Sequence, residues 1–316
     1  MDLSIIIPVY NGSQTIVPLV DEIFSRIRDH IDFEVVLVND NSSDNSWEIL
    51  QSLAEEHSGR LIAIDLARNF GEHNAVMAGY HHCTGKYIVN IDDDFQNPPS
   101  EIIKLVDEIK KGHDVVYGFY VEKKHSVFRN LGSWFNDKVA NVMLKKPKWL
   151  YLSSFRIISR SLLDQILKYD GPFLYIDGLI LRSTDRISQV TVEHSSSQSR
   201  QSTYTFTKLL RLWSHVFFNF SILPLRVASL FGIIFSVVGF IGVFVVIYWR
   251  VTQPEQPLGW ASVIVSILIF SGIQLIVLGV IGEYLGRYFL HFNKTPQFVV
   301  RTIVGDIAES YLPKQG

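Results

Sequence analysis

The chain has 316 residues, 47% of them hydrophobic and 19% charged, and a formal net charge of −2 at pH 7. This near-neutral balance provides no positive field to attract nucleic acid, so no nucleic-acid partner is expected. An aromatic content of 13% excludes a disordered or low-complexity chain, and the single cysteine, Cys83, excludes an internal disulfide and a cysteine zinc cage.

The N-terminal part, residues 1–203, predicts strands and helices in alternation. This order is typical of an α/β domain with a mostly parallel sheet and helices on both faces. The apolar start lacks a basic segment and stops at Pro8, so we expect no signal peptide and a cytosolic domain. The expected strands are Leu3–Val9, Phe33–Asn39, Leu61–Asp65, Tyr87–Asp92 and Asp114–Gly118, and the expected helices Thr15–His30, Ser46–Glu56, Glu72–Cys83 and Glu101–Lys111.

Polar clusters follow three of these strands. They are Pro8–Gly12, Asn39–Asp44 and Asp92–Gln96. A single cluster is typical of an ordinary turn. Three at the carboxyl ends of parallel strands predict a ligand site, because these ends meet at one edge of the sheet.

The triplet Asp92-Asp93-Asp94 is the most informative of these clusters. Adjacent carboxylates repel one another unless a cation offsets their charge. Oxygen ligands of this kind suit Mg²⁺ or Mn²⁺, which usually also binds substrate phosphates. If the extended backbone continues past the strand, Asp92, Asp94 and Gln96 share one side. The alternative is a solvated acidic turn.

Two long apolar segments follow in the C-terminal third. No charged residue lies between Val227 and Trp249 or between Leu258 and Gly282. Roughly 20 helical residues cross a bilayer, so we expect spans over 225–250 and 258–282 and a cytosolic tail over 283–316. Positive residues flank the spans on the side away from the connector (Lys208, Arg211, Arg226, Arg287, Lys294, Arg301), which predicts cytosolic termini. Glu283 and Arg287 form a helix salt bridge or meet lipid headgroups.

Residues 204–224 predict an amphipathic helix. Apolar side chains, including Trp213 and Phe217, recur there at helical spacing, whereas Lys208 and Arg211 tend to the other side. This pattern is typical of a helix lying in the membrane interface. The alternative is a helix that faces a protein core.

The combination of motifs resembles family 2 glycosyltransferases of the GT-A (Rossmann-like) fold, in the polyprenyl-phosphate branch that includes bactoprenol glucosyltransferase and dolichol-phosphate mannose synthase. The matching segments cover nearly the whole chain. They are Ile6–Asn11, Val38–Asp44, Arg68–Gly71, Asp92–Pro99, Ser154–Arg156, Ser202–Tyr204 and Gly282–Arg287.

The resemblance implies a role for each matching residue. Pro8, Tyr10, Asn11, Asp40, Asp92 and Arg200 would bind the nucleotide, with Asp40 on the uracil ring and Arg200 in a mobile lid over the diphosphate. Asp92, Asp94 and Gln96 would hold Mg²⁺ or Mn²⁺. Arg156, Arg129, Ser133 and Ser154 would face the acceptor phosphate, although Arg129 fits a surface charge equally well. Asp94, Arg156 and Asp93 would be catalytic.

One departure from the family concerns the catalytic base. Many relatives carry Asp where this chain has Ser154, so either Asp93 or Asp177 replaces it or no base is needed. We favour the second, because a phosphate monoester has a second pKa near about 6 and is already a dianion at cytosolic pH. It would attack the anomeric carbon directly, with inversion, if arginine offsets its charge.

The predicted activity is therefore transfer of a sugar, by resemblance glucose from UDP-glucose, to polyprenyl (undecaprenyl) phosphate at the cytosolic membrane face, by a homo-oligomer. Other donors (UDP-GlcNAc, GDP-mannose) stay open, because a few hydroxyl contacts decide the sugar. A polysaccharide or sphingolipid transferase is the second hypothesis, although its usual QxxRW motif is not found. A non-catalytic membrane scaffold is the third, against which the clustered carboxylates argue.

Overall fold

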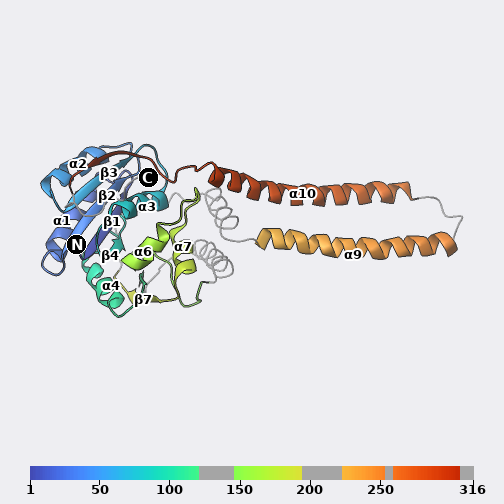
Figure 1. Ribbon diagram of the computed structural model, residues 1–316, viewed down its shortest axis with the longest axis horizontal. Coiled ribbons are helices and arrows are strands. Elements are labelled where there is room, and N and C mark those ends of the chain that lie inside the picture. The colour runs from blue at the N-terminus through green and yellow to red at the C-terminus, as the bar shows by residue number, and fades with distance from the viewer. Residues whose placement is uncertain (121–145, 194–222, 253–258, 307–316) are drawn as a thin grey trace. The chain divides into compact units, whose positions relative to one another are not determined.

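The computed structural model describes residues 1–120, 146–193, 223–252 and 259–306. The chain divides into two compact units (Figure 1). The first combines Met1–Tyr204 with Lys294–Gly316, and the second is Thr205–Asn293. The first unit therefore takes in residues from both sides of the apolar segments.

An eight-stranded mixed sheet forms the centre of the first unit. Its strands are β1 (Leu3–Val9), β2 (Phe33–Asn39), β3 (Leu61–Leu66), β4 (Tyr87–Asn90), β5 (Val115–Phe119), β6 (Arg156–Ser159), β7 (Ile187–Thr191) and β8 (Val300–Val304). Their spatial order is β7-β5-β6-β4-β1-β2-β3-β8. The four central strands β4-β1-β2-β3 pair in parallel, as predicted. The pairs β4–β6, β5–β6 and β3–β8 are antiparallel, so the sheet is less uniformly parallel than its N-terminal half predicts.

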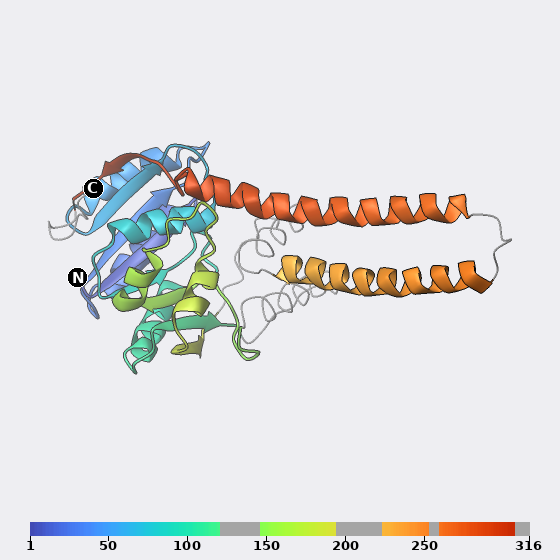
Figure 2. The ribbon, with the colours of Figure 1, turned by 45° about the vertical axis from the view of Figure 1, so that its right-hand side comes forward.

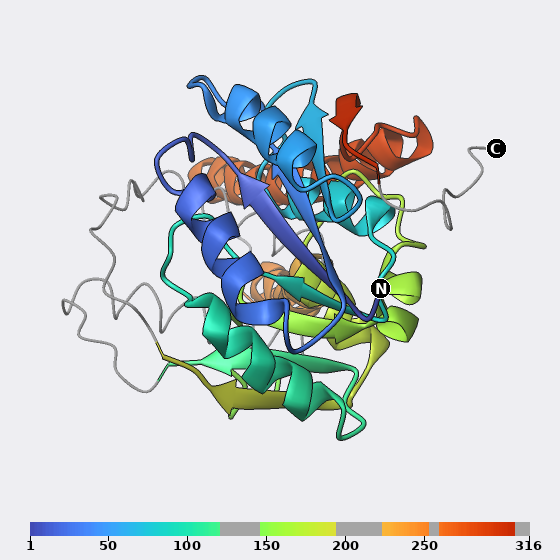
Figure 3. The same ribbon diagram turned by 90° about the vertical axis from the view of Figure 1, so that its left-hand side faces the viewer.

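Helices cover both faces of this sheet, which confirms the predicted α/β class. They are α1 (Ile16–Ile27), α2 (Ser46–Glu56), α3 (Glu72–His82), α4 (Ile102–Ile109), α6 (Arg160–Ile166) and α7 (Ile176–Ser183), with a short 3₁₀ helix at Pro99–Glu101 before α4. Side chains of α1, α2 and α4 belong to one buried cluster, and those of α3, α6 and α7 to another. Figure 3 shows α1 and α4 in front of the strands.

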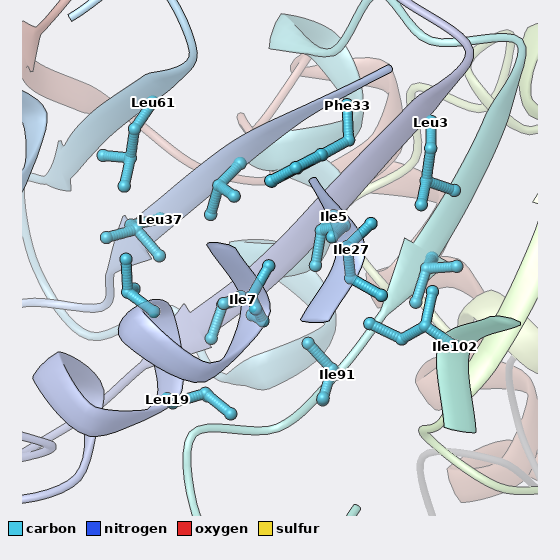
Figure 4. Packing of buried hydrophobic residues seen from close by; sticks show 14 of the residues in the cluster. Leu3, Ile5, Ile7, Leu19, Ile27, Phe33, Leu37, Leu61, Ile91 and Ile102 are labelled. Carbon is cyan, nitrogen blue, oxygen red and sulfur yellow. The ribbon is translucent and has the colours of Figure 1, made fainter. Parts of the chain in front are cut away.

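Alternation along the strands explains the two cores. Ile5 and Ile7 of β1 pack in the cluster with α1, whereas Ile6 between them packs in the cluster with α3. Figure 4 shows the first cluster, in which Phe33 and Ile27 meet the β1 side chains. All of these side chains are fully buried, as expected where both faces of a central strand are covered.

The strand β8 was not predicted. The sequence assigns residues 283–316 to a tail, but Val300–Val304 pair antiparallel with β3 and end the sheet. The five residues of this strand do not alternate regularly between apolar and polar side chains, and they are half-buried or exposed. Pairing with a distant strand and packing of Val300 and Val304 against the two buried clusters stabilise it, and local sequence reveals neither.

The second unit contains the helices α9 (Leu223–Thr252) and α10 (Trp260–Phe292), which lie side by side and antiparallel in Figures 1 and 2. The rings of Phe235 and Phe270 meet at 6.3 Å. Within the described residues, Ile269–Phe292 is long and apolar enough to cross a membrane, and Ala228–Gly242 is a shorter apolar stretch. Glu283 accepts hydrogen bonds of 2.6 and 2.8 Å from Arg287, so the salt bridge forms within α10.

Gly79 tests how closely α3 packs on the sheet. A Cβ at this position would lie 2.5 Å from Cγ2 of Ile6 and 3.3 Å from a methyl group of Val38. We expect Gly79→Ala to lower the free energy of unfolding by about 1–3 kcal/mol, as overpacked cores do. Thermal unfolding of the full chain would measure this. Ser52→Ala on the exposed side of α2 is the control, and equal melting temperatures for both variants would contradict the packing.

Candidate functional site

The loop after β1 is tied to the loop after β2 by hydrogen bonds. The backbone N–H of Asn11 donates to Oγ of Ser42 at 2.9 Å, and that of Gly12 donates to Oγ of Ser46 at 3.0 Å. In return, the Ser43 N–H donates to Oδ1 of Asn11 at 2.8 Å. The first two predicted polar clusters therefore form one connected surface.

Asp44 organises the second loop. Its carboxylate accepts hydrogen bonds from the Ser46 hydroxyl at 2.5 Å and from the Ser13 N–H at 3.3 Å. Burial pulls the pKa of Asp44 upward, but these hydrogen bonds outweigh it and leave the pKa below its ordinary value. Hydrogen bonds therefore suffice to keep the Asp44 carboxylate ionised.

Strained backbone occurs in all three polar loops. Asn11, Asn41 and Phe95 have φ values of 54°, 52° and 60°. Asparagine tolerates this left-handed conformation, whereas it is unusual for a bulky residue such as phenylalanine. Such strain costs about 1–3 kcal/mol for each residue and clusters at functional sites, where the surrounding contacts hold it in place.

Asp40 holds the segment that follows β3. Its two carboxylate oxygens accept the N–H groups of Phe70 at 2.7 Å and Gly71 at 2.9 Å. Burial raises its pKa more than these hydrogen bonds lower it. The Arg68 guanidinium lies 4.7 Å from the centre of the Phe70 ring. The segment Arg68–Gly71, part of the family resemblance, therefore lies at the same edge as the three polar loops.

The acidic triplet does not continue the strand. Strand β4 ends at Asn90, and residues 93–97 form turns, so the predicted alternation of Asp92, Asp94 and Gln96 on an extended backbone is wrong. Phe95 in the left-handed conformation breaks the extended run. The Gln96 N–H instead donates to Oδ1 of Asp94 at 3.1 Å.

The three carboxylates lie in different surroundings. Oδ2 of Asp92 accepts the Ser154 hydroxyl at 2.5 Å. Oδ2 of Asp93 lies against Gly12, so closely that a side chain there would clash with it. Asp93 therefore packs against the first loop, and Ser154 touches Asp92 rather than standing free.

Electrostatic repulsion is concentrated at Asp92. Burial raises its pKa to about 7, and the Glu72 and Asp94 carboxylates raise it too, against the lowering effect of the Ser154 hydrogen bond and of Arg156. Burial likewise raises the pKa of Glu72, where the charge of Arg156 opposes that of Asp177 and Asp94. The protein around Glu72 reduces the hydration of its carboxyl group, although part of the residue stays exposed to solvent.

Within the described part of the chain no three histidine, cysteine or acidic side chains come close enough to hold a metal ion by themselves. A cation at Asp92 and Asp94 would therefore need ligands from a substrate or water. Such partial coordination is how proteins usually bind Mg²⁺ with phosphates.

Arg156 is buried, only 3% exposed, beneath this edge. Its Nη1 donates to Oδ1 of Asp177 at 2.6 Å, and the Tyr117 hydroxyl donates to the same carboxylate at 2.9 Å. Because Arg156 is buried, the predicted contact of its guanidinium with an acceptor phosphate would require the surrounding protein to move. Asp177, an alternative base in the sequence, is committed to Arg156 and lies at the start of α7.

His73 and Tyr175 lie beside this ion pair. Their rings meet edge to face at 5.3 Å. Burial lowers the pKa of His73 to about 4, so its imidazole is neutral at pH 7. Burial also raises the pKa of Tyr175, so its hydroxyl keeps its proton.

Several predicted residues fall outside the part of the chain that the structure describes. These are Arg129, Ser133 and Arg200, together with residues 204–222 of the amphipathic helix predicted over 204–224. Pro8 and Tyr10 lie at the end of β1 and just after it, and the Tyr10 side chain is 49% exposed.

Glu72 is the site residue that the sequence reasoning missed. It opens α3 directly after Gly71, at the carboxyl end of the third parallel strand. The rule that singled out the other three loops applies equally to this one, so the signal was present in the order of the elements.

The comparisons with known proteins agree with this geometry. A model of the family described as "Glycosyl transferase family 2" matches residues 4–167. Undecaprenyl-phosphate 4-deoxy-4-formamido-L-arabinose transferase of Yersinia enterocolitica is 31% identical over 310 residues, which cover 96% of this chain and 94% of the relative. The protein of the same name from Photorhabdus laumondii is 30% identical over 314 residues, with coverage of 96% and 94%.

Solved structures share the fold at lower identity. Glucosyl-3-phosphoglycerate synthase from Mycobacterium tuberculosis, in complex with phosphoglyceric acid, has a TM-score of 0.51 at 19% identity over 68% of this chain and 78% of that one. Its complex with Mn²⁺, uridine diphosphate and phosphoglyceric acid has a TM-score of 0.50 at 20% identity, over 68% and 75%.

The protein is thus a glycosyltransferase with a GT-A fold. It belongs to glycosyl transferase family 2, in the polyprenyl-phosphate branch that its motifs predict.

The raised pKa of Asp92 predicts how stability depends on pH. An acid whose pKa is higher in the folded than in the unfolded protein destabilises the fold as pH rises from about 4 towards 7. Without metal we expect Asp92→Asn to melt above the wild type at pH 8, and this advantage to vanish near pH 4. Melting temperatures in EDTA at both pH values measure this. A variant that melts lower at pH 8 would contradict the repulsion.

Proposed function

We propose that the protein transfers a sugar from a nucleotide sugar to a polyprenyl phosphate, taken to be undecaprenyl phosphate. The observation that carries the proposal is the contact of the acidic triplet, through Asp93 and Gly12, with the connected loops after β1 and β2 at one sheet edge. The relatives, similar over 96% of the chain, are transferases to undecaprenyl phosphate by name.

Asp92 and Asp94 fit a divalent cation, Mg²⁺ or Mn²⁺. Burial raises the pKa of Asp92, the Glu72 and Asp94 carboxylates raise it too, and a cation would relieve this repulsion. Gln96 stays a candidate third ligand, with its backbone already bonded to Asp94. When bound, the metal would offset the charge that grows on the departing diphosphate.

The nucleotide would lie over the loops after β1 and β2. Tyr10 offers an exposed ring for stacking, and Pro8 and Asn11 line the same loop. Both oxygens of Asp40 already accept backbone N–H groups, so a uracil N–H would share one of them. Arg200 remains the candidate for the diphosphate lid.

The acceptor phosphate would attack without a catalytic base. The Ser154 hydroxyl donates a hydrogen bond to Asp92, Asp177 is paired with Arg156, and Asp93 packs against Gly12. Each of the three already contacts the protein, and a phosphate dianion has no proton to give. The reaction would be a single displacement with inversion. Arg129 and Ser133 remain candidates for the phosphate, whereas Arg156 would position α7 and the Ser154 segment.

The membrane part would bring this edge to the lipid. A polyprenyl chain leaves the bilayer at a cost of about 0.8 kcal/mol per exposed CH₂, so its phosphate stays at the headgroup plane. We propose that α9 and α10 both cross the membrane, with the catalytic unit and both termini cytosolic. The exposed apolar side chains along both helices, such as Phe240 and Leu275, support burial in lipid.

The donor sugar is the finer question. The names of the relatives favour 4-deoxy-4-formamido-L-arabinose, whereas the family resemblance favours glucose carried by UDP. Purified full-length protein with Mn²⁺, undecaprenyl phosphate and a panel of UDP-sugars would decide between them by mass spectrometry of the lipid. We expect one lipid-phosphate sugar. Release of UDP without any new lipid would contradict the acceptor assignment.

Asp94→Ala tests the carboxylate site. We expect turnover to fall by at least about 10²- to 10³-fold, because a group that offsets transition-state charge is removed. Asp107→Ala is the matched control, since Asp107 is exposed on α4 and lies outside the site loops. Equal rates for the two variants would remove Asp94 from the mechanism.

A further inference from the structure

The strand that returns from the apolar helices is fastened to the sheet through Arg301. Figures 1 and 2 show this strand, β8, in dark red. Nη1 of Arg301 donates to Oδ2 of Asp65 at 3.1 Å, and Nη2 donates to the carbonyl of Ala67 at 2.8 Å. Both acceptors lie at the carboxyl end of β3, on the edge of the sheet where the site loops gather.

The pairing of β8 with β3 is irregular at Arg301, which is paired with no residue of β3 in the backbone register. Thr302 pairs with Asp65 and Val300 with Leu66, and the register shifts between these two pairs. A bulge of this kind turns a side chain away from the regular alternation. Here it accompanies the contact between Arg301 and Asp65.

Asp65 passes the contact to the neighbouring strand. Its side chain is buried, with Oδ1 accepting Nδ2 of Asn39 at 2.7 Å. Asn39 is buried too, and its Oδ1 accepts the Ser42 N–H at 3.1 Å. The Asn39 amide is therefore held in one orientation, with its nitrogen towards Asp65 and its oxygen towards the loop after β2.

Ser42 completes the path to the first loop. Its Oγ accepts the N–H of Asn11, whose left-handed backbone needs such contacts to persist. Every link from Arg301 to Asn11 is a hydrogen bond of 2.7 to 3.1 Å. All links but the first lie in the N-terminal part of the chain.

We propose that Arg301 is a positioning residue for the nucleotide: through Asp65, Asn39 and Ser42 it fixes the loops after β1 and β2 that receive the donor. The inference rests on the proposed function, which places the nucleotide at these loops. The strand after the second apolar helix is then part of the donor site rather than a tail.

The charge of Asp65 explains why the arginine matters. A buried carboxylate without a cation is costly, so loss of Arg301 favours movement of the Asp65 side chain away from its buried position. This movement removes the partner of the Asn39 amide nitrogen and releases the loop. Nucleotide affinity therefore falls, while the acceptor and the reacting carboxylates keep their own contacts.

Titration of the full-length protein with UDP in the presence of Mn²⁺ tests this. We expect Arg301→Gln to weaken UDP binding by about tenfold, the size typical of residues that orient a direct ligand. The KM for the donor should rise in parallel, with kcat and the KM for polyprenyl phosphate within about twofold of the wild type. Arg186→Gln, an exposed arginine before β7, is the matched control and should leave all of these unchanged.

A double variant separates positioning from simple loss of stability. Asp65→Asn combined with Arg301→Gln removes the buried charge and keeps an oxygen for the Asn39 amide, so UDP affinity should return to within about threefold of the wild type. Should Arg301→Gln fail to fold, this double variant carries the test, and weak UDP binding by a folded double variant overturns the inference.

Two results are decisive in different ways. Unchanged UDP affinity in Arg301→Gln, with a wild type that binds UDP, overturns the positioning role alone. A wild type that binds no UDP overturns the donor assignment and the inference with it.

Discussion

Burial of Asp92 just after β4, together with repulsion from nearby carboxylates, is the constraint on which the site depends. Burial raises the pKa of Asp92 and the Glu72 and Asp94 carboxylates raise it too, with the buried Arg156 already paired to Asp177. A divalent cation and the diphosphate that it binds would remove this repulsion. The same negative charges that destabilise the protein without a cation would therefore favour binding of the cation and the diphosphate.

The surrounding loops are built to hold this arrangement in place. Hydrogen bonds join the loop after β1 to that after β2, and Asp93 packs against Gly12 between them. Asn11 and Phe95 keep their strained, left-handed backbone conformations because the surrounding contacts hold them in place. Through Asp65 the connection extends to β8, which gives the segment after the apolar helices a role in the site.

The sequence predicts the parallel centre of the fold well and its margins poorly. The strands β1, β2 and β3 are mostly apolar runs of six or seven residues bounded by turn residues, so periodicity and length suffice to find them. The short strands β6 and β8 depend on partners far along the chain, and β6 contains the charged Arg156, which hides it from an apolar pattern.

The site divides in the same way. Asp92, Asp94 and Asp40 follow strands and could be found by position, but their partners could not. Arg156, for example, pairs with Asp177, which is 21 residues away along the chain. The turn at Phe95, which overturned the expected alternation, depends on local backbone strain that composition does not show.

Binding of Mn²⁺ with and without nucleotide tests the central claim most directly. Because Asp92 and Asp94 supply too few ligands alone, electron paramagnetic resonance should find weak Mn²⁺ binding to the free protein. Addition of UDP should tighten it by at least about tenfold in the wild type but not in Asp94→Ala. Mn²⁺ affinity that is the same with and without UDP would contradict a cation shared between the carboxylates and the diphosphate.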